Sequence, residues 1–164
     1  MFEQRNEAIT NKIISEFAKT IEMFDLSSSE ARLFAFLYLR EHPMTLDEMS
    51  ESLGKSKTSM STSVRSLLDL NLVTRVWRKG VRKDLYQANT HLFKSFMNAS
   101  ITKWIDATNH QRDSLEELVE KVKSQHSDQQ GNKELVAIEN QLTLIIEFHQ
   151  QIEKAFRDMK NEDT

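Results

Sequence analysis

The sequence contains no cysteine, a single proline and three glycines. Without cysteine, the chain cannot form a disulfide framework, a thiolate nucleophile or a cysteine-ligated zinc site. So few turn-forming residues disfavour an all-β fold, which needs many turns. The longest unbroken apolar run, Leu33–Leu39, is far short of the roughly 20 residues that span a bilayer. Residues 1–12 are polar and charged and lack the apolar segment of a secretion signal, so we expect a cytoplasmic protein without a membrane partner.

Helical periodicity is the dominant pattern in what remains. The length of 164 residues allows one domain, or a small domain with an accessory element, and the 38% of hydrophobic residues can supply a core. In the first segment the apolar residues follow the spacing of one buried helix face. They are Ile9, Ile13, Ile14, Phe17, Ile21 and Phe24.

Three further helices are predicted between residues 27 and 70. Ser27 and Glu30 have the spacing of a capping box, which begins a helix over about 28–41 that is apolar around most of its circumference. His42-Pro43 ends that helix, because proline disfavours helical geometry in the residue before it.

The next two helices are short and closely connected. Thr45 and Glu48 form a second capping box, which begins a helix that ends at Gly54. Ser56 then begins a helix that runs to about Leu70 and is followed by Asn71, a residue type that tolerates the left-handed conformation.

Two stretches with β character follow, at residues 72–77 and 84–88. Gly80 lies between them, where a hairpin needs its turn. Residues 91–125 are again helical in pattern, and the polar residues 127–132 predict a linker.

The last segment carries a heptad pattern. Its apolar residues are spaced alternately by three and four, with one histidine among them. This spacing favours a helix-helix seam between two copies of the chain, although the stripe could also pack within its own domain. The seam residues are Leu135, Ile138, Leu142, Ile145, His149, Ile152, Phe156 and Met159. His149 could set the register of the seam or act as a pH switch.

The order of helix, tight turn, helix and charged hairpin predicts a winged helix-turn-helix. The fold class is therefore mainly α with a small β-hairpin. In this motif the second helix of the pair enters the DNA major groove with its N-terminal residues near base edges. The side opposite its apolar stripe carries hydroxyls and cations, and the hairpin tip carries four cations. The candidate DNA-binding residues are Lys55, Lys57, Thr58, Ser59, Ser61, Thr62, Arg65, Arg78, Lys79, Arg82 and Lys83.

The charge distribution supports this interpretation. The formal net charge of the chain is -3, which by itself argues against a nucleic-acid partner. Between Lys55 and Tyr86, however, eight Lys and Arg residues face only two Asp residues, so this segment carries +6 and the rest carries -9. A basic segment on an acidic body is typical of a DNA-binding protein. An ordinary solvated surface remains the alternative for each feature taken alone.

These motifs resemble those of the MarR-type winged-helix regulators, and in particular their GbsR-like branch. The resemblance covers most of residues 10–125 and includes PMTLDEMSESL from Pro43, SKTSMSTSVRSLLDLNLV from Ser56 and VWRKGVRKDLYQA from Val76. It implies a winged helix-turn-helix fold, a dimeric state and a role in transcriptional regulation. Two positions depart from the family pattern: Asn71 replaces a common glycine, and Val81 replaces a common acidic residue of the wing.

Enzymatic sites are poorly supported by the sequence. The histidines at 42, 91, 110, 126 and 149 lie far apart and form no metal-binding pair, and no glycine-rich phosphate loop is present. The neighbouring carboxylates Asp47-Glu48 and Glu116-Glu117 have the positions of cap or helix-surface residues. We therefore expect no enzyme activity, no cofactor and no metal.

The resemblance implies a small effector as well. The GbsR-like branch looks like a set of regulators of compatible-solute uptake and synthesis genes, some of which respond to choline-type effectors. A quaternary ammonium ion prefers an aromatic cage, because ring faces attract the cation. These aromatic residues could equally be plain core. The candidate cage residues are Tyr38, Trp77, Tyr86, Phe93, Phe96 and Trp104.

The sequence as a whole predicts a homodimeric regulator. A repressor is favoured over an activator, because no activation module is evident. Residues 1–25 would contribute a helix to dimerisation, residues 26–90 would form the DNA-binding domain, and residues 91–164 would form the helical dimerisation region. Two recognition helices related by a two-fold axis would bind a pseudo-palindromic operator in double-stranded DNA. The alternative is a winged-helix protein-interaction module without direct DNA readout.

Overall fold

The computed structural model describes residues 2–128 and 133–162, which form a mainly helical chain with one small antiparallel sheet. This confirms the predicted fold class. The elements in chain order are α1 (Phe2–Glu22), α2 (Ser28–Leu39), α3 (Leu46–Leu53), α4 (Lys57–Asp69), β1 (Val73–Val76), β2 (Leu85–Ala88), α5 (Leu92–Asp128) and α6 (Lys133–Glu162). The chain divides into two compact units, residues 1–99 and 100–164. No helix of the described residues is long and apolar enough to cross a membrane.

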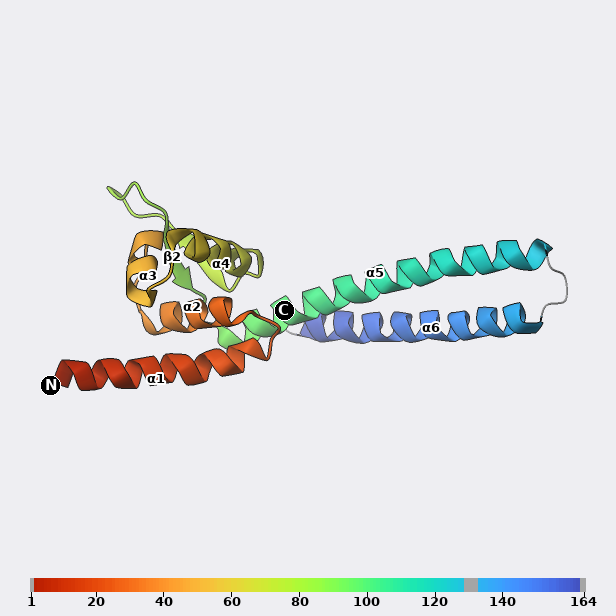
Figure 1. The fold of residues 1–164 in the computed structure, drawn as a ribbon, viewed down its shortest axis with the longest axis horizontal. Helices are drawn as coiled ribbons and strands as arrows, with labels where there is room; N and C mark the ends of the chain where they lie inside the picture. The colour runs from red at the N-terminus through yellow and green to blue at the C-terminus, as the bar shows by residue number, and fades with distance from the viewer. Residues whose placement is uncertain (1, 129–132, 163–164) are drawn as a thin grey trace. The chain divides into compact units, whose positions relative to one another are not determined.

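Helix α2 forms the centre of the first unit, as its apolar circumference predicts. Leu33, Phe34 and Leu37 are almost completely buried, and α1 packs along one side of α2, where the rings of Phe17 and Phe34 meet edge to face (Figure 1). The apolar stripe of α1 is only partly used in this core. Ile14 and Ile21 are buried, whereas Ile9 and Ile13 are about half exposed, at 53% and 47%.

The short-range signals fix the N-termini of α2, α3 and α4 as predicted, whereas α2 ends at Leu39, two residues before the predicted end, because Arg40 is already extended. Both capping boxes are present. The side chains of Ser27 and Thr45 each accept a hydrogen bond from the backbone N–H three residues later, and the backbone N–H of each donates to the carboxylate of the glutamate at that position. Gly54 ends α3 in the left-handed conformation, with φ of 62°. Asn71 also adopts a positive φ, of 56°, directly before β1. Interactions between residues close in sequence therefore explain where α2, α3 and α4 begin and where the chain reverses after α3 and α4.

Strands β1 and β2 pair in an antiparallel register with Val73 opposite Ala88 and Val76 opposite Leu85. An isolated bridge between Met44 and Tyr86 connects this hairpin to the segment before α3. We call β1, β2 and the loop 77–84 between them the wing. In Figure 1 the loop extends away from the helices of its unit.

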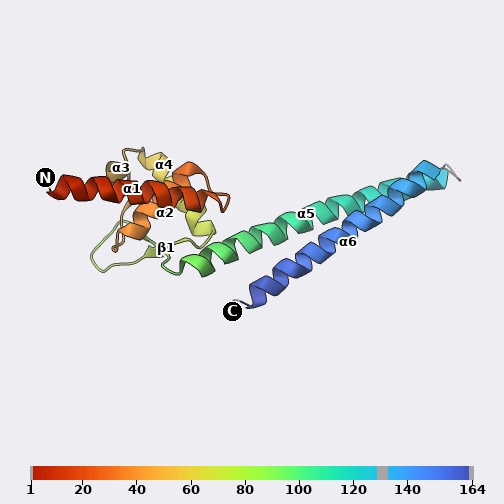
Figure 2. The same ribbon diagram turned by 90° about the horizontal axis from the view of Figure 1, so that it is seen from below.

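The second unit is a long helical hairpin. Helices α5 and α6 run antiparallel (Figure 2), and the Lys160 ammonium donates to the Thr102 hydroxyl at 3.1 Å near its open end. The rings of Trp104 and Phe156 bridge the two helices with centroids 5.3 Å apart. The predicted linker began two residues too early, because Ser127 and Asp128 still belong to α5, and residues 129–132 lie outside the described residues.

Candidate nucleic-acid interface

Helix α4 buries one side and exposes the other. Met60, Ser63, Val64 and Leu67 lie in the core, and the Ser63 hydroxyl is 3.1 Å from the Ser29 hydroxyl of α2. This hydrogen bond fixes the rotation of α4 at a position where an alanine would only fill space. The opposite side is the outer face of α4, whose exposed residues are Lys57, Thr58, Thr62, Arg65 and, at the C-terminal end, Asp69. Ser59 and Ser61 flank that face and are half-buried.

The turn before α4 is held by side-chain hydrogen bonds to the backbone. The Ser56 hydroxyl caps the helix by accepting from the Ser59 N–H at 3.1 Å. The Ser50 hydroxyl donates to the Lys55 carbonyl at 2.5 Å, and the Lys55 side chain is exposed. Because a helix N-terminus carries partial positive charge and free N–H groups, this end of α4 is suited to anionic groups.

The wing loop gathers the other predicted cations. Arg78, Lys79, Arg82 and Lys83 are all exposed. The loop reverses at Gly80, which has a φ of 85°, and the Val81 N–H donates to the Arg78 carbonyl at 3.2 Å. At its base Arg75 lies 3.8 Å from Asp84 and over the ring of Tyr86. All eleven predicted DNA-binding residues thus lie on α4, the turn before it and the wing.

One acidic residue that the sequence pattern did not single out joins these two parts. Asp47, in the first turn of α3, lies 2.9 Å from the Lys57 ammonium and 2.6 Å from the Lys83 ammonium. Hydrogen bonds from Lys83 and then Lys57 lower the pKa of the Asp47 carboxyl to about 2, and Asp47 in turn raises the pKa of Lys83. Nothing in the local sequence separates Asp47 from an ordinary helix-capping acid, because its partners are 10 and 36 residues away.

A hollow of about 290 Å³ lies among α3, the start of α4 and the wing. Its lining includes Lys57, Arg82 and Lys83 together with the carboxylates of Asp47 and Asp84. Such a small, charged and open site has the chemistry to receive an anionic group such as a phosphate. It has few apolar walls, so it does not fit a drug-like molecule.

The structure places the candidate effector residues in different surroundings. Tyr38 and Phe96 both pack against Phe34 in the core of the first unit, and Tyr86 is buried. Trp77, on the wing, is 80% exposed, and Phe93 is 74% exposed at the start of α5. Trp104 belongs to the second unit and packs on Phe156. The ring contacts of Tyr38, Phe96 and Trp104 are each made to residues outside the predicted set.

The residues of the predicted heptad seam on α6 differ in their exposure. Leu135, Leu142, His149 and Phe156, which recur every seven residues, are half-buried. Ile138, Ile145 and Met159 are exposed, at 46%, 42% and 40%, whereas Ile152 is half-buried. The intervening half-buried positions are Glu139, Ile146 and Glu153, one residue after Ile138, Ile145 and Ile152.

Several large apolar residues of α6 are exposed on one side of the helix. We call the residues Ile138, Leu144, Ile145, Phe148 and Met159 the open face of α6; each is at least 40% exposed. The imidazole Nδ1 of His149, beside this face, lies 2.8 Å from the Ile145 carbonyl of its own helix. Helix α6 is thus more apolar than its contact with α5 requires. No group of three or more His, Asp or Glu side chains in the described part of the chain is placed to hold a metal ion.

Part of the chain is similar to known proteins. Residues 24–82 match the family model described as the MarR family. The HTH-type transcriptional repressor GbsR of Bacillus subtilis is 39% identical over 98 residues, which cover 60% of this chain and 54% of that protein. The HTH-type transcriptional repressor OpcR of the same organism is 37% identical over 92 residues, covering 56% of this chain and 50% of that repressor.

The chain therefore spans about half the length of the curated relatives it matches. Among solved structures, the crystal structure of a transcriptional regulator has a TM-score of 0.51 at 16% sequence identity, covering 91% of this chain and 98% of that one. At this identity the likeness concerns the fold alone. Both of these relatives are named as transcriptional repressors.

Proposed function

We propose that this chain is a sequence-specific DNA-binding regulator of the MarR type, acting as a homodimeric repressor; the match of residues 24–82 to the MarR family model supports this. The observation that carries the proposal is the common placement of its cations and hydroxyls. The outer face of α4 and the wing loop present them on a basic segment, and the buried side of α4 anchors this segment to the core. The names of the relatives GbsR and OpcR, both transcriptional repressors, support the sign of regulation.

The two parts of the interface have different tasks in this proposal. The N-terminal half of α4 enters the major groove, where Thr58, Thr62 and Arg65 lie nearest to base edges. The Thr62 hydroxyl donates to the Thr58 carbonyl at 3.1 Å, so it approaches DNA as an acceptor, for example of a cytosine or adenine amino group. The wing cations contact phosphates or the neighbouring minor groove, where they add affinity without reading sequence.

Dimerisation supplies the second half-site. We infer that residues 91–164, with a contribution from 1–25, form the homodimer interface, and that residues 26–90 bind DNA. Two apolar surfaces that the single chain leaves exposed support this inference: the open face of α6, and Ile9 and Ile13 of α1. A two-fold dimer would bind a pseudo-palindromic operator whose half-sites are about one helical turn apart.

A choline-type quaternary ammonium effector remains part of the proposal, with compatible-solute genes as the regulated class. In the first unit the rings of Trp77 and Phe93 are exposed, which supports it because an exposed ring face can receive a cation. Calorimetric titration with choline and with glycine betaine tests this part. The absence of heat with both compounds would remove the effector from the proposal and leave the DNA-binding role intact.

Selection of bound DNA tests the central claim. Purified protein is incubated with sheared genomic DNA of its source organism at about 0.15 M salt, and the recovered fragments are sequenced and then used in retardation assays. The proposal expects a shared pseudo-palindrome and binding that weakens steeply with salt. The alternative function, a winged-helix module that docks on another protein, expects no salt-dependent retardation of any duplex.

A further inference from the structure

Asp47 lies between the two parts of the interface and contacts both. Its Oδ1 atom is 2.9 Å from the Lys57 ammonium, at the first residue of α4, and its Oδ2 atom is 2.6 Å from the Lys83 ammonium of the wing loop. Each carboxylate oxygen therefore has its own cation. The result is a bridge from α3 to the recognition helix on one side and to the wing on the other.

The wing loop has few other polar ties to the helices. Among the hydrogen bonds and ion pairs of the described residues, those of loop 77–84 are the turn between Arg78 and Val81, the pair of Asp84 with Arg75 of β1, and the pair of Lys83 with Asp47. The first two lie within the wing itself. The Lys83–Asp47 pair is therefore what relates the loop to the helical part of the interface.

Global stability does not explain this bridge. All three side chains are exposed, at 61% for Lys57, 67% for Lys83 and 43% for Asp47. Ion pairs this accessible to water contribute little to folding and are screened by salt. A carboxylate on this surface also opposes DNA binding, because it repels phosphates and neutralises part of the charge of two cations.

We propose that Asp47 is a positioning residue that sets the wing relative to α4 and thereby increases the preference for the operator over random DNA. This inference rests on the proposed function. In a specific complex α4 contacts the major groove while the wing contacts the DNA backbone at the same time. A wing that is already held in position before binding loses less conformational entropy when the complex forms. In a non-specific complex cations bind phosphates without fixed register, and the Asp47 carboxylate only weakens the attraction.

Asp47→Asn is the direct variant, since it keeps the size of the side chain and the helix position while removing the charge. Affinity for a random duplex should rise, and the ratio of operator affinity to random affinity should fall at least threefold. A circular dichroism melt checks that the variant folds. These binding assays use the operator recovered by the selection and a scrambled duplex of equal length.

Asp84→Asn is the matched control. It also removes one negative charge from the wall of the same hollow, but its partner Arg75 belongs to the wing, so no bridge to α3 is broken. A second matched pair removes cations. Lys83→Gln should lower the affinity ratio because it breaks the bridge, whereas Lys79→Gln, on the same loop, should weaken operator and random DNA by the same factor.

A measurement without DNA separates this inference from the proposed function. Backbone ¹⁵N order parameters of loop 77–84 in the free protein report its motion on the picosecond-to-nanosecond timescale. They should fall in Asp47→Asn and Lys83→Gln and stay at the wild-type level in Asp84→Asn and Lys79→Gln. Order parameters that do not change in Asp47→Asn would overturn the positioning role, as would equal affinity ratios for Asp47→Asn and Asp84→Asn. Failure of the wild-type protein to retard any duplex would instead overturn the proposed function, and the specificity role with it.

Discussion

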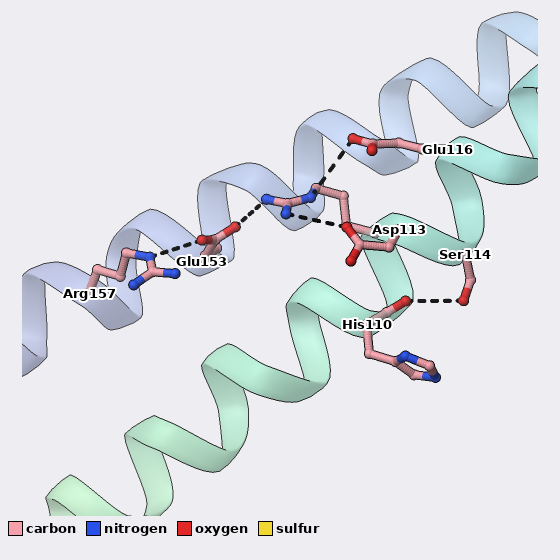
Figure 3. Close-up of polar contacts among 7 residues, drawn as sticks. His110, Asp113, Ser114, Glu116, Glu153 and Arg157 are labelled. Carbon is pink, nitrogen blue, oxygen red and sulfur yellow. Dashed lines mark hydrogen bonds and ion pairs between the residues drawn. The ribbon is translucent and has the colours of Figure 1, made fainter.

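The Arg112 guanidinium of α5 donates a hydrogen bond to the Glu153 carboxylate of α6 at 2.5 Å, which connects the two long helices. The Arg157 guanidinium also donates to Glu153, at 2.9 Å (Figure 3). Both partners of the central pair are largely buried, with 26% of the Arg112 and 14% of the Glu153 side chain exposed. The same two helices are also joined by the Trp104–Phe156 ring contact and by the Lys160–Thr102 hydrogen bond, and the Arg112–Glu153 pair relates one position of α5 to one position of α6.

Removal of Glu153 should therefore destabilise the helical hairpin. Glu153→Ala leaves the Arg112 guanidinium partly buried without its main acceptor, and we expect a loss of about 1–3 kcal/mol in the free energy of unfolding. The matched control is Glu120→Ala, because the Glu120–Lys123 pair at 3.3 Å has 76% and 53% of its side chains exposed. The control should cost less than about 0.5 kcal/mol beyond helix propensity. Urea unfolding followed by circular dichroism measures both variants. Equal urea midpoints for Glu153→Ala and Glu120→Ala would show that the Arg112–Glu153 pair does not stabilise the fold.

Features encoded within a few residues could be predicted from the sequence. The capping boxes of Ser27 and Thr45 and the left-handed conformations of Gly54 and Asn71 depend on neighbours at most five residues away. The same holds for the hairpin around Gly80 and for the outer face of α4, which follows from helical periodicity. The winged helix-turn-helix could be predicted because its parts are short and occur in a diagnostic order.

Relationships between distant residues could not be predicted in this way. Asp47 meets Lys83 across 36 positions, and Arg112 meets Glu153 across 41, and in both cases the sequence contains many equivalent charges. The heptad on α6 shows a subtler case. Spacing alone did not reveal that Ile138 and Ile145 are exposed. The half-buried residues that alternate with Leu135, Leu142, His149 and Phe156 are instead Glu139, Ile146 and Glu153.

The Asp47 bridge predicts an unusual acid titration. Because Lys83 and Lys57 donate to its carboxylate, the pKa of Asp47 should be about 2 in the folded protein instead of 3.8. A carboxyl whose pKa is depressed by folding stabilises the native state above its unfolded pKa, and this contribution is lost as the pH falls from about 4 to 2. Carboxyl ¹³C NMR titration measures the value directly. Lys83→Gln should raise the pKa toward 3.8 by more than Lys57→Gln, and a wild-type value near 3.8 would show that the bridge does not persist in solution.

The wing should contribute affinity that is independent of sequence. Arg82→Ala removes one exposed cation from the loop, so binding to operator and random duplex should weaken by the same factor. If Arg82 contacts one phosphate, the slope of log affinity against log salt should become shallower by about 0.9. Lys19→Ala, an exposed cation of α1 paired with Glu16, serves as the control and should change neither quantity. An unchanged salt slope in Arg82→Ala would remove this residue from the interface.

Arg65 should behave differently if it reads base edges from α4. Its side chain is exposed on the outer face, two helical turns after Thr58. Arg65→Ala should then cost about 1–3 kcal/mol at particular base pairs and relax the preference at those positions. Affinity measured against a set of operators with single base-pair changes reveals this pattern. A uniform loss over the whole set would make Arg65 a phosphate contact.

The open face of α6 should carry the homodimer. Ile145 is 42% exposed in the single chain and lies about two helical turns after Ile138 and one turn before Phe148, so Ile145→Lys would place a charge within the apolar contact. We expect the dissociation constant of the dimer to rise at least tenfold, as measured by sedimentation equilibrium. Thr143→Lys is the matched control, because Thr143 is exposed on the same helix but points away from the open face, and it should leave the dimer intact.

Because two half-sites are read only by a dimer, Ile145→Lys should also abolish retardation of the full operator while the melting of the DNA-binding unit stays unchanged. Equal dissociation constants for the two variants would assign dimerisation to another surface, for which Ile9 and Ile13 of α1 are exposed apolar candidates.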